Sequence, residues 1–281
     1  MTQNLFFFKK PLTHSTIFAA MLAFAAGPVA AASIQTLAEA HFEGVDASDP
    51  QGPASVGSLS SSVSASGGNA DAFQDINGVA AVRVDGGSAN GQPGNTLLAR
   101  STWSDTITNT SAIAQHYVAS LSIPQIVLHI SGSGFSLVPG DQLKSSYAIT
   151  LDINGLDKFT SSALLHSGNP GHVLEVAGTD LGGVKDANAI RYTFAPFTGS
   201  LDLGTFAPNA SFVATYRLES AIDIPGFEVF ADSRIGDPLA INGNGTAITI
   251  TSSPVPLPGG LSLLLSGIAA IGRGKRGRVS A

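Results

Sequence analysis

Three oxygen-bearing side chains lie close together in one short segment, at Asp152, Asn154 and Asp157. Carboxylate and amide oxygens are the ligands that Ca²⁺ prefers, so this segment is the candidate site for a calcium ion. It lacks the Asp, Gly and Glu spacing of an EF-hand loop. Asn154-Gly155 is instead a dipeptide typical of a tight hairpin turn, so we expect a turn and no bound cofactor.

The histidines form no recognisable metal or catalytic motif. Only His166 and His172 lie close to each other in the sequence, and no HExxH pattern occurs. The chain has no cysteine and can form neither a thiolate zinc site nor a disulfide. No G-x-S-x-G nucleophile motif occurs, and the G-x-G-x-x-G match at residues 272–277 lies in a basic tail with no strand before it. We therefore expect no metal site, no catalytic residue and no enzymatic activity.

Sugar binding usually needs exposed aromatic rings, and Trp103 is the only tryptophan of the chain. Trp103 shares the strand parity of Leu97 and Ile107, which favours a place in the core. The 20 acidic residues leave open a pair of catalytic carboxylates, because the separation of such a pair is set in space and not in sequence. A carbohydrate-binding or carbohydrate-hydrolysing protein is therefore the alternative to a non-catalytic one.

Period-two alternation of apolar and polar residues dominates the middle of the chain and predicts β-strands. One face of the segment 142–154 carries Leu143, Tyr147, Ile149 and Leu151, and the segment 211–222 alternates in the same way. Weaker strand patterns cover residues 79–84, 97–108, 117–130, 190–194, 227–235 and 246–250. With Gly, Asn and Asp turns between them and no helical repeat, these segments predict one antiparallel β-sandwich, immunoglobulin-like or jelly-roll-like. The Ser/Gly-rich lead-in 33–68 is expected at a sheet edge.

Charge is distributed unevenly along the chain. Residues 1–32 and 273–281 hold six of the 14 basic residues and no acid, so the segment between them carries 8 − 20 = −12. An acidic body is repelled by phosphate groups, which excludes nucleic acid as an expected partner.

The N-terminal segment has the order of a secretory signal peptide. Lys9-Lys10 precede the apolar run 17–26, and small residues follow up to Ala32. Ten apolar residues are too few to span a bilayer. We expect signal peptidase to recognise Ala30 and Ala32 and to cut before Ser33.

The C-terminal segment also consists of three parts. Prolines alternate at Pro254, Pro256 and Pro258, an apolar or small run covers residues 259–272, and a basic tail follows. Alternate prolines keep the backbone extended and accessible to a protease. Cations stay on the cytoplasmic side of a membrane, so the tail is expected to anchor the run through four basic residues, Arg273, Lys275, Arg276 and Arg278. A final buried strand is the alternative for the apolar run.

This three-part order resembles the VPLPA-type variant of the bacterial PEP-CTERM sorting signal, which membrane proteases called exosortases process. The residues that match the motif are Val255, Pro256, Leu257, Pro258 and Gly259, with Gly259 where the family commonly has Ala. The resemblance implies an exosortase as processing enzyme, a transient stay in the inner membrane, and a Gram-negative bacterium that makes extracellular polysaccharide. The sequence as a whole thus predicts a signal peptide at 1–32, a β-sandwich at 33–253 with an apolar helix at each end of the chain, and a sorting signal at 254–281.

Two segments of the body are similar to parts of bacterial surface proteins. Residues 103–124 resemble the Thr-Asn-Thr strand pair of bacterial immunoglobulin-like surface domains, and residues 201–220 resemble a segment frequent in uncharacterised PEP-CTERM proteins. Together with the two end segments, they predict an exported protein, tethered before processing and then found at the cell surface or in the extracellular matrix. Its body is expected to act by interaction, with extracellular polysaccharide as a candidate partner.

Overall fold

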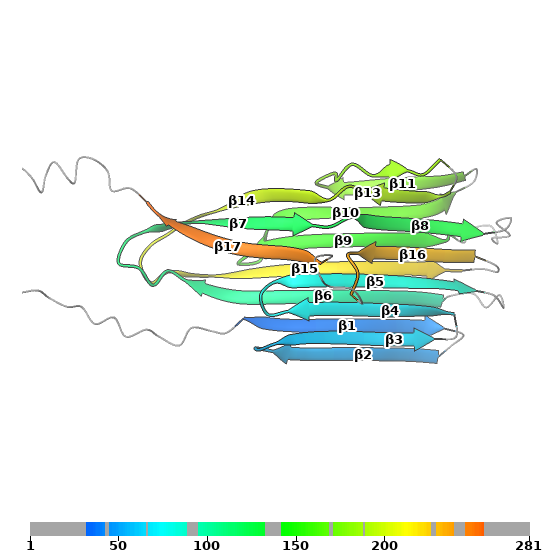
Figure 1. The fold of residues 1–281 in the computed structure, drawn as a ribbon, viewed down its shortest axis with the longest axis horizontal. Helices are drawn as coiled ribbons and strands as arrows, with labels where there is room; N and C mark the ends of the chain where they lie inside the picture. Colours follow the sequence, from blue (N-terminus) through cyan, green and yellow to red (C-terminus); the bar gives the residue numbers. More distant parts are fainter. Residues whose placement is uncertain are drawn as a thin grey trace, which may run out of the picture.

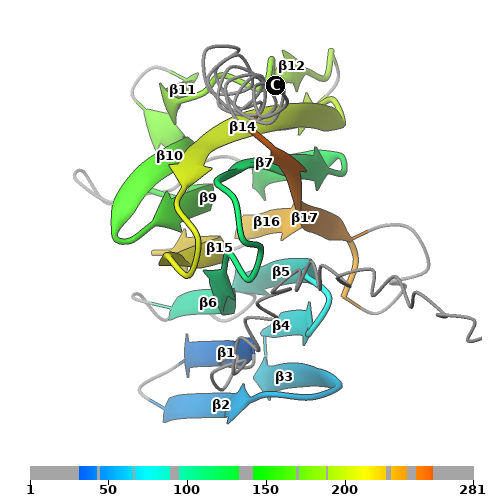
Figure 2. The same cartoon turned by 90° about the vertical axis from the view of Figure 1, so that its left-hand side faces the viewer.

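The computed structural model describes residues 32–42, 45–65, 67–88, 95–132, 142–168, 171–187, 189–225, 229–238 and 245–255. The strands of these segments form two antiparallel sheets that pack face to face as a sandwich (Figures 1 and 2). The predicted all-β sandwich is therefore confirmed. Residues 1–31 and 256–281, which contain Ala30 and most of the predicted sorting signal, lie outside the described residues.

Seven strands form sheet A. Their order across the sheet is β11 (Gly171–Gly178), β10 (Leu156–Gly168), β9 (Lys144–Ile153), β15 (Ser211–Ile224), β6 (Asn95–Thr108), β1 (Ser33–Phe42) and β2 (Val45–Ala54).

Ten strands form sheet B. Eight of them follow one another in the order β12 (Val184–Lys185), β13 (Arg191–Phe194), β8 (Ile126–Gly132), β16 (Val229–Ile235), β5 (Val79–Ser88), β17 (Thr246–Pro254), β7 (Gln115–Ile123) and β14 (Phe197–Phe206). The other two extend the sheet from β5: β4 (Gly68–Asp75) pairs with β5, and β3 (Ser58–Ala65) pairs with β4.

Prolines divide sheet B into two halves. Pro124 separates β7 from β8, and Pro196 separates β13 from β14. The two breaks lie side by side, because Ile126 is opposite Phe194 on one side of them and Ile123 is opposite Phe197 on the other. Proline has no N–H to donate to a ladder, so each strand stops there. The prediction of one strand over residues 117–130 was therefore wrong.

Beyond this break, β17, β7 and β14 continue without β4 and β5, which meet in a turn before Val79 (Figure 1). Sheet B is thus narrower than sheet A at this end of the sandwich. Part of the inner face of β6 consequently has no strand of sheet B directly over it.

The core lies between the sheets, where the predicted alternation is confirmed. In β9, Tyr147, Ile149 and Leu151 are buried, and in β15 the side chains of Phe212 and Tyr216 are fully enclosed. Burial of one face of each strand makes the period-two pattern necessary.

The Ser/Gly-rich lead-in forms β1, β2, β3 and the start of β4, with β2 and β3 as edge strands, in agreement with its predicted position. Pro50 and Pro53 lie in β2. Proline and short polar side chains weaken an edge as a template for further strand pairing.

The two ends of the described chain leave the sandwich at the same end, which we call the terminal pole (residues 108–115, 206–211 and 252–255). β17 ends at this pole with Pro254 opposite Gln115, and β1 begins on the same side of the sandwich, with Ser33 opposite Ser104 (Figure 1). Among the described residues, no helix has the length and apolarity needed to cross a bilayer.

Candidate functional site

The candidate calcium ligands lie at a hairpin turn. Asn154 and Gly155 adopt φ values of 54° and 77° between β9 and β10, as a two-residue hairpin requires. Asp152 Oδ1 accepts a hydrogen bond from the Gly155 N–H at 3.1 Å, and Asn154 Oδ1 accepts one from the Val213 N–H at 2.8 Å. These oxygens therefore hold the turn together and attach it to β15, while Asp157 is exposed.

The described residues contain no group of three or more His, Asp or Glu side chains placed to hold a metal ion. The turn residues Asp152 and Asp157 are opposite each other across β9 and β10, and Asn154 turns its oxygen away toward β15. The structure thus confirms the predicted turn.

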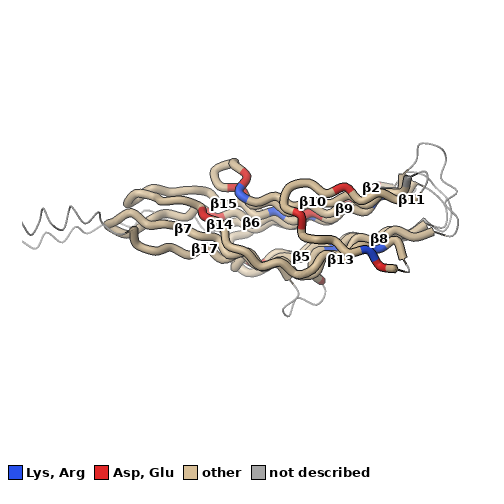
Figure 3. The backbone as a smooth tube through the Cα atoms, turned by 90° about the horizontal axis from the view of Figure 1, so that it is seen from above, with Lys and Arg blue, Asp and Glu red and all other residues tan. Residues whose placement is uncertain are grey.

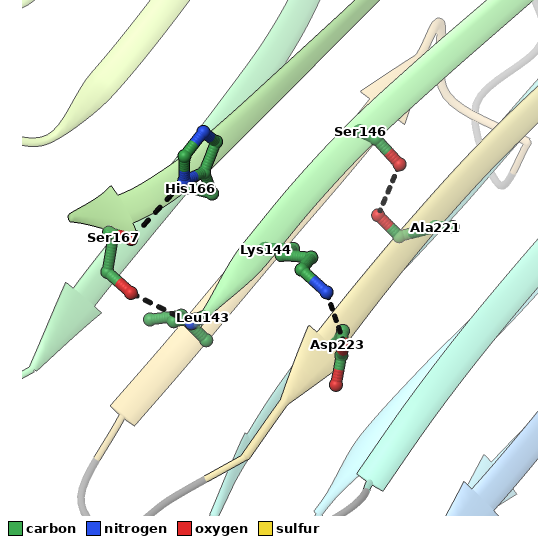
Figure 4. A network of polar contacts seen from close by, with 7 residues as sticks. All are labelled: Leu143, Lys144, Ser146, His166, Ser167, Ala221 and Asp223. Atoms are coloured by element: carbon green, nitrogen blue, oxygen red, sulfur yellow. Dashed lines mark hydrogen bonds and ion pairs between the residues drawn. The ribbon is translucent and has the colours of Figure 1, made fainter. Parts of the chain in front are cut away.

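His166 and His172 have partners within the sheet. His166 Nε2 lies 3.2 Å from Glu175 Oε1, and its Nδ1 lies 3.3 Å from the Ser167 carbonyl oxygen. Lys144 on β9 is opposite His166, and its Nζ lies 3.2 Å from Asp223 Oδ2 (Figure 4). His172 packs edge-on against Tyr192, and burial and Lys185 lower the pKa of His172. The pair thus has structural contacts instead of a shared ligand geometry.

A charged cluster crosses the outer face of sheet B. Asp232 on β16 is opposite Asp85 on β5 and His129 on β8. Arg83 Nη2 lies 2.9 Å from Asp85 Oδ1. Burial raises the pKa of Asp232, against the opposing effect of Arg234 and Arg83. Because both signs alternate across the cluster, it is a charge network of the sheet surface and not a set of free metal ligands.

Trp103 lies in the core, as its parity predicted. Its side chain is 7% exposed, and its Nε1–H donates a hydrogen bond to the Ile76 carbonyl oxygen at 3.0 Å. Trp103 is therefore not an exposed platform for sugars.

Trp103 nevertheless lines an open cleft of about 290 Å³ between β6 and β17. The cleft lies where β4 and β5 have ended, so the inner face of β6 forms its floor and β17 one wall. Its lining residues are Ile76, Asn77, Trp103, Asp105, Ile107, Tyr117, Ile248, Thr249, Ile250 and Ser252.

Asp105 is the unusual residue of this cleft. It follows Trp103 by two positions on β6 and is opposite the buried Ala214, so it lies on the face of sheet A that turns toward sheet B. Burial raises the pKa of Asp105, and a hydrogen bond from the Thr106 N–H partly opposes this. A carboxylate is thus held at the margin of an apolar core.

Tyr117 and Ser252 complete the polar part of the cleft. Burial raises the pKa of Tyr117, and a hydrogen bond with the Ser252 side chain lowers it in part. The ring of Tyr117 packs edge-on against Phe206 and Phe212, with centroid distances of 5.6 and 5.2 Å. These three rings close the sandwich at the terminal pole and fix the position of the Tyr117 hydroxyl.

The edge of β17 beside the cleft carries unpaired backbone groups. The Ile248 N–H points away from β7 and donates to the Gly78 carbonyl oxygen at 3.3 Å. Because successive residues of a strand alternate in direction, Ile250 and Ser252 also turn their N–H and C=O groups away from β7. No strand of the described chain pairs with them on that side.

Asn109, the central residue of the Thr-Asn-Thr segment, is a structural residue of the terminal pole. Its Nδ2 donates hydrogen bonds to the carbonyl oxygens of Ile113 and Phe206, both at 2.9 Å. Its Oδ1 accepts hydrogen bonds from the N–H and hydroxyl of Ser111.

Three of the predicted processing residues fall within the described chain. Ala32 immediately precedes β1, and Ser33 is the first residue of β1. Val255 follows β17, and its N–H still donates to the Ala114 carbonyl oxygen at 3.1 Å. The predicted motif residues Pro256 to Gly259 and the basic residues Arg273, Lys275, Arg276 and Arg278 lie outside the described residues.

The sequence reasoning did not identify Asp105. Its parity with Trp103 was available as a signal, since a carboxylate at an apolar position of a strand is unexpected. No protein-family model matches the chain, and no curated protein matches it either.

Proposed function

We propose that the protein is exported and sorted by an exosortase to the cell surface or extracellular matrix, where the sandwich acts by non-catalytic interaction. The observation that carries the proposal is the common exit of both chain ends. β1 starts at Ser33 on the side of the sandwich that faces the terminal pole, and β17 leads straight into Val255 at that pole. A body built in this way can be released by signal peptidase and held by its C-terminal segment at the same end.

The charge distribution supports the same orientation. Residues 106–115, 203–215 and 245–255 contain no charged residue, and the tip of the sandwich at the terminal pole is drawn without red or blue in Figure 3. The remainder of the acidic body carries the charges. Anionic lipid headgroups repel acidic surfaces, so a charge-free pole is the end that can approach an inner membrane most closely.

The immunoglobulin-like or jelly-roll-like character of the body remains part of this proposal, supported by the antiparallel pairing within two packed sheets. For the alternative, carbohydrate-related function, carbohydrate binding is favoured over carbohydrate hydrolysis. Glycoside hydrolysis usually needs two carboxyl groups across the scissile bond, and Asp105 is the one carboxylate among the described residues that line the cleft.

Intact-mass measurement on protein from the native host, combined with cell fractionation, tests sorting. We expect a chain that begins at Ser33, ends within or near residues 255–259, and is found outside the inner membrane. A C-terminal tag retained in the membrane fraction would indicate a permanent anchor. A full-length chain in the soluble cytoplasm would refute export.

A further inference from the structure

The exposed backbone of β17 is protected against the addition of another strand. The Ile248 N–H already has a partner in Gly78, and Pro254, which falls on the same outward parity, has no N–H. Only Ile250 and Ser252 therefore offer complete backbone groups along this edge. Asp105, on the inner face of β6, lines the space beside this edge.

The same groups match a small hydroxylated ring. Asp105 supplies a carboxylate that accepts hydrogen bonds, the N–H groups of Ile250 and Ser252 are donors, and the Ser252 hydroxyl does both. Ile107 and the small exposed part of Trp103 lie on the floor beside them. A sugar presents hydroxyl groups that both donate and accept, together with an apolar C–H face.

Charge and size narrow the ligand class. Asp105 and the net negative body repel uronic acids and other anions. A simple cation would satisfy Asp105, but it has no acceptor for the two N–H groups of β17. A volume of about 290 Å³ is at the small end of the range for organic ligands, which suits a short unit of a longer chain that leaves through the open side.

We propose that the cleft between β6 and β17 binds a neutral sugar unit of an extracellular polysaccharide, with Asp105 as the main hydrogen-bond acceptor. This deepens the proposed interaction role of the body and rests on it for its biological setting. Binding by the purified chain does not depend on sorting, so the failure of one proposal is distinguishable from the failure of the other.

Trp103 provides the readout, because it is the only tryptophan and lines the cleft. The full-length chain, purified in a detergent without a sugar headgroup, is titrated with neutral trisaccharides of glucose, mannose, galactose and N-acetylglucosamine. Tryptophan emission and titration calorimetry are measured in parallel. We expect at least one trisaccharide to shift the emission and release heat at the same concentrations, while trigalacturonate does neither.

Asp105→Asn keeps the shape of the side chain and removes its charge. The loss of a charge-assisted hydrogen bond is expected to weaken the affinity about tenfold or more. Asp157→Asn, at an exposed hairpin position, is the matched control and should leave the affinity unchanged. Circular dichroism confirms that both variants are folded.

Three results would overturn the proposal. The first is the absence of any signal with all four neutral trisaccharides. The second is binding that Asp105→Asn leaves intact. The third is a concentration-dependent dimer that protects Trp103 from a soluble quencher, since this would assign the β17 edge to pairing between two copies of the chain.

Discussion

Replacing Tyr216 by Phe is expected to stabilise the protein. Tyr216 lies in β15 at the centre of sheet A, and its side chain is fully buried. Among the residues that the structure describes, its hydroxyl has no hydrogen-bond partner of good geometry. The Thr246 hydroxyl beside it donates its own hydrogen to the Ala80 carbonyl oxygen at 3.1 Å. A buried hydroxyl without a partner costs about 1–3 kcal/mol. Since Thr246 offsets part of this cost, we expect Tyr216→Phe to raise the free energy of unfolding by about 1 kcal/mol.

Tyr147 provides a matched control on the neighbouring strand β9. It is also buried, at 2% exposure, but its hydroxyl lies 3.1 Å from Ser161 Oγ, within hydrogen-bond distance. Tyr147→Phe removes that bond and leaves Ser161 without its partner. We therefore expect it to lower the free energy of unfolding by about 1 kcal/mol, a change of opposite sign from the same chemical substitution.

Urea unfolding of the full-length chain, followed by the emission of Trp103, measures both variants against the parent. Equal slopes against urea concentration would show that the same surface is exposed on unfolding in all three proteins. A loss of stability in Tyr216→Phe similar to that in Tyr147→Phe would refute the reasoning. It would mean that Tyr216 donates an effective hydrogen bond to Thr246.

Three further predictions concern the terminal pole, a constrained glycine and the cleft. Asn109→Ala should lower the free energy of unfolding by about 2–3 kcal/mol in the same assay, because two carbonyl groups and Ser111 lose their partner. Gly178→Ala should destabilise more than Gly182→Ala: both glycines have positive φ, but a Cβ at Gly178 would lie 2.4 Å from the Thr160 carbonyl oxygen, whereas nothing lies within 4 Å of one at Gly182. Burial raises the pKa of the Asp105 carboxyl group above its ordinary 3.8, so the folded chain binds the carboxyl proton more tightly than the unfolded chain does. The contribution of Asp105 to the free energy of unfolding therefore falls as the pH rises through the folded pKa. Asp105→Asn should remove this pH dependence. The free energy of unfolding of the variant minus that of the parent, measured in urea between about pH 3 and pH 7, should therefore increase with pH. A difference that stays constant with pH would contradict the raised pKa of Asp105.

The parts of the fold that the sequence predicted are those set by local constraints. β9 and β15 were predictable because each buries one face and solvates the other, which forces alternation on the side chains. The hairpin at Asn154-Gly155 was predictable because few residue pairs adopt positive φ at two successive positions. The buried position of Trp103 followed from its parity with Leu97 in β6.

The remaining features depend on distant parts of the chain. Alternation continues across Pro124, so the pattern alone gave one strand where the ladder gives β7 and β8. The cleft exists because β5 begins only at Val79 and leaves β6 uncovered beside β17, a consequence of strand lengths far apart in sequence. Asp105 is therefore ordinary in its local sequence and unusual only when the opposite sheet is in place.

The position of the cleft relates the two proposals to each other. The cleft lies in the half of the sandwich nearer the terminal pole, beside the strand that leads into Val255. If the C-terminal segment is held at an anionic bilayer, repulsion of the acidic remainder favours an upright body with its charge-free pole toward the lipid. In that orientation the cleft would lie on the membrane-proximal half of the body before processing, so the two proposals concern the same half of the sandwich.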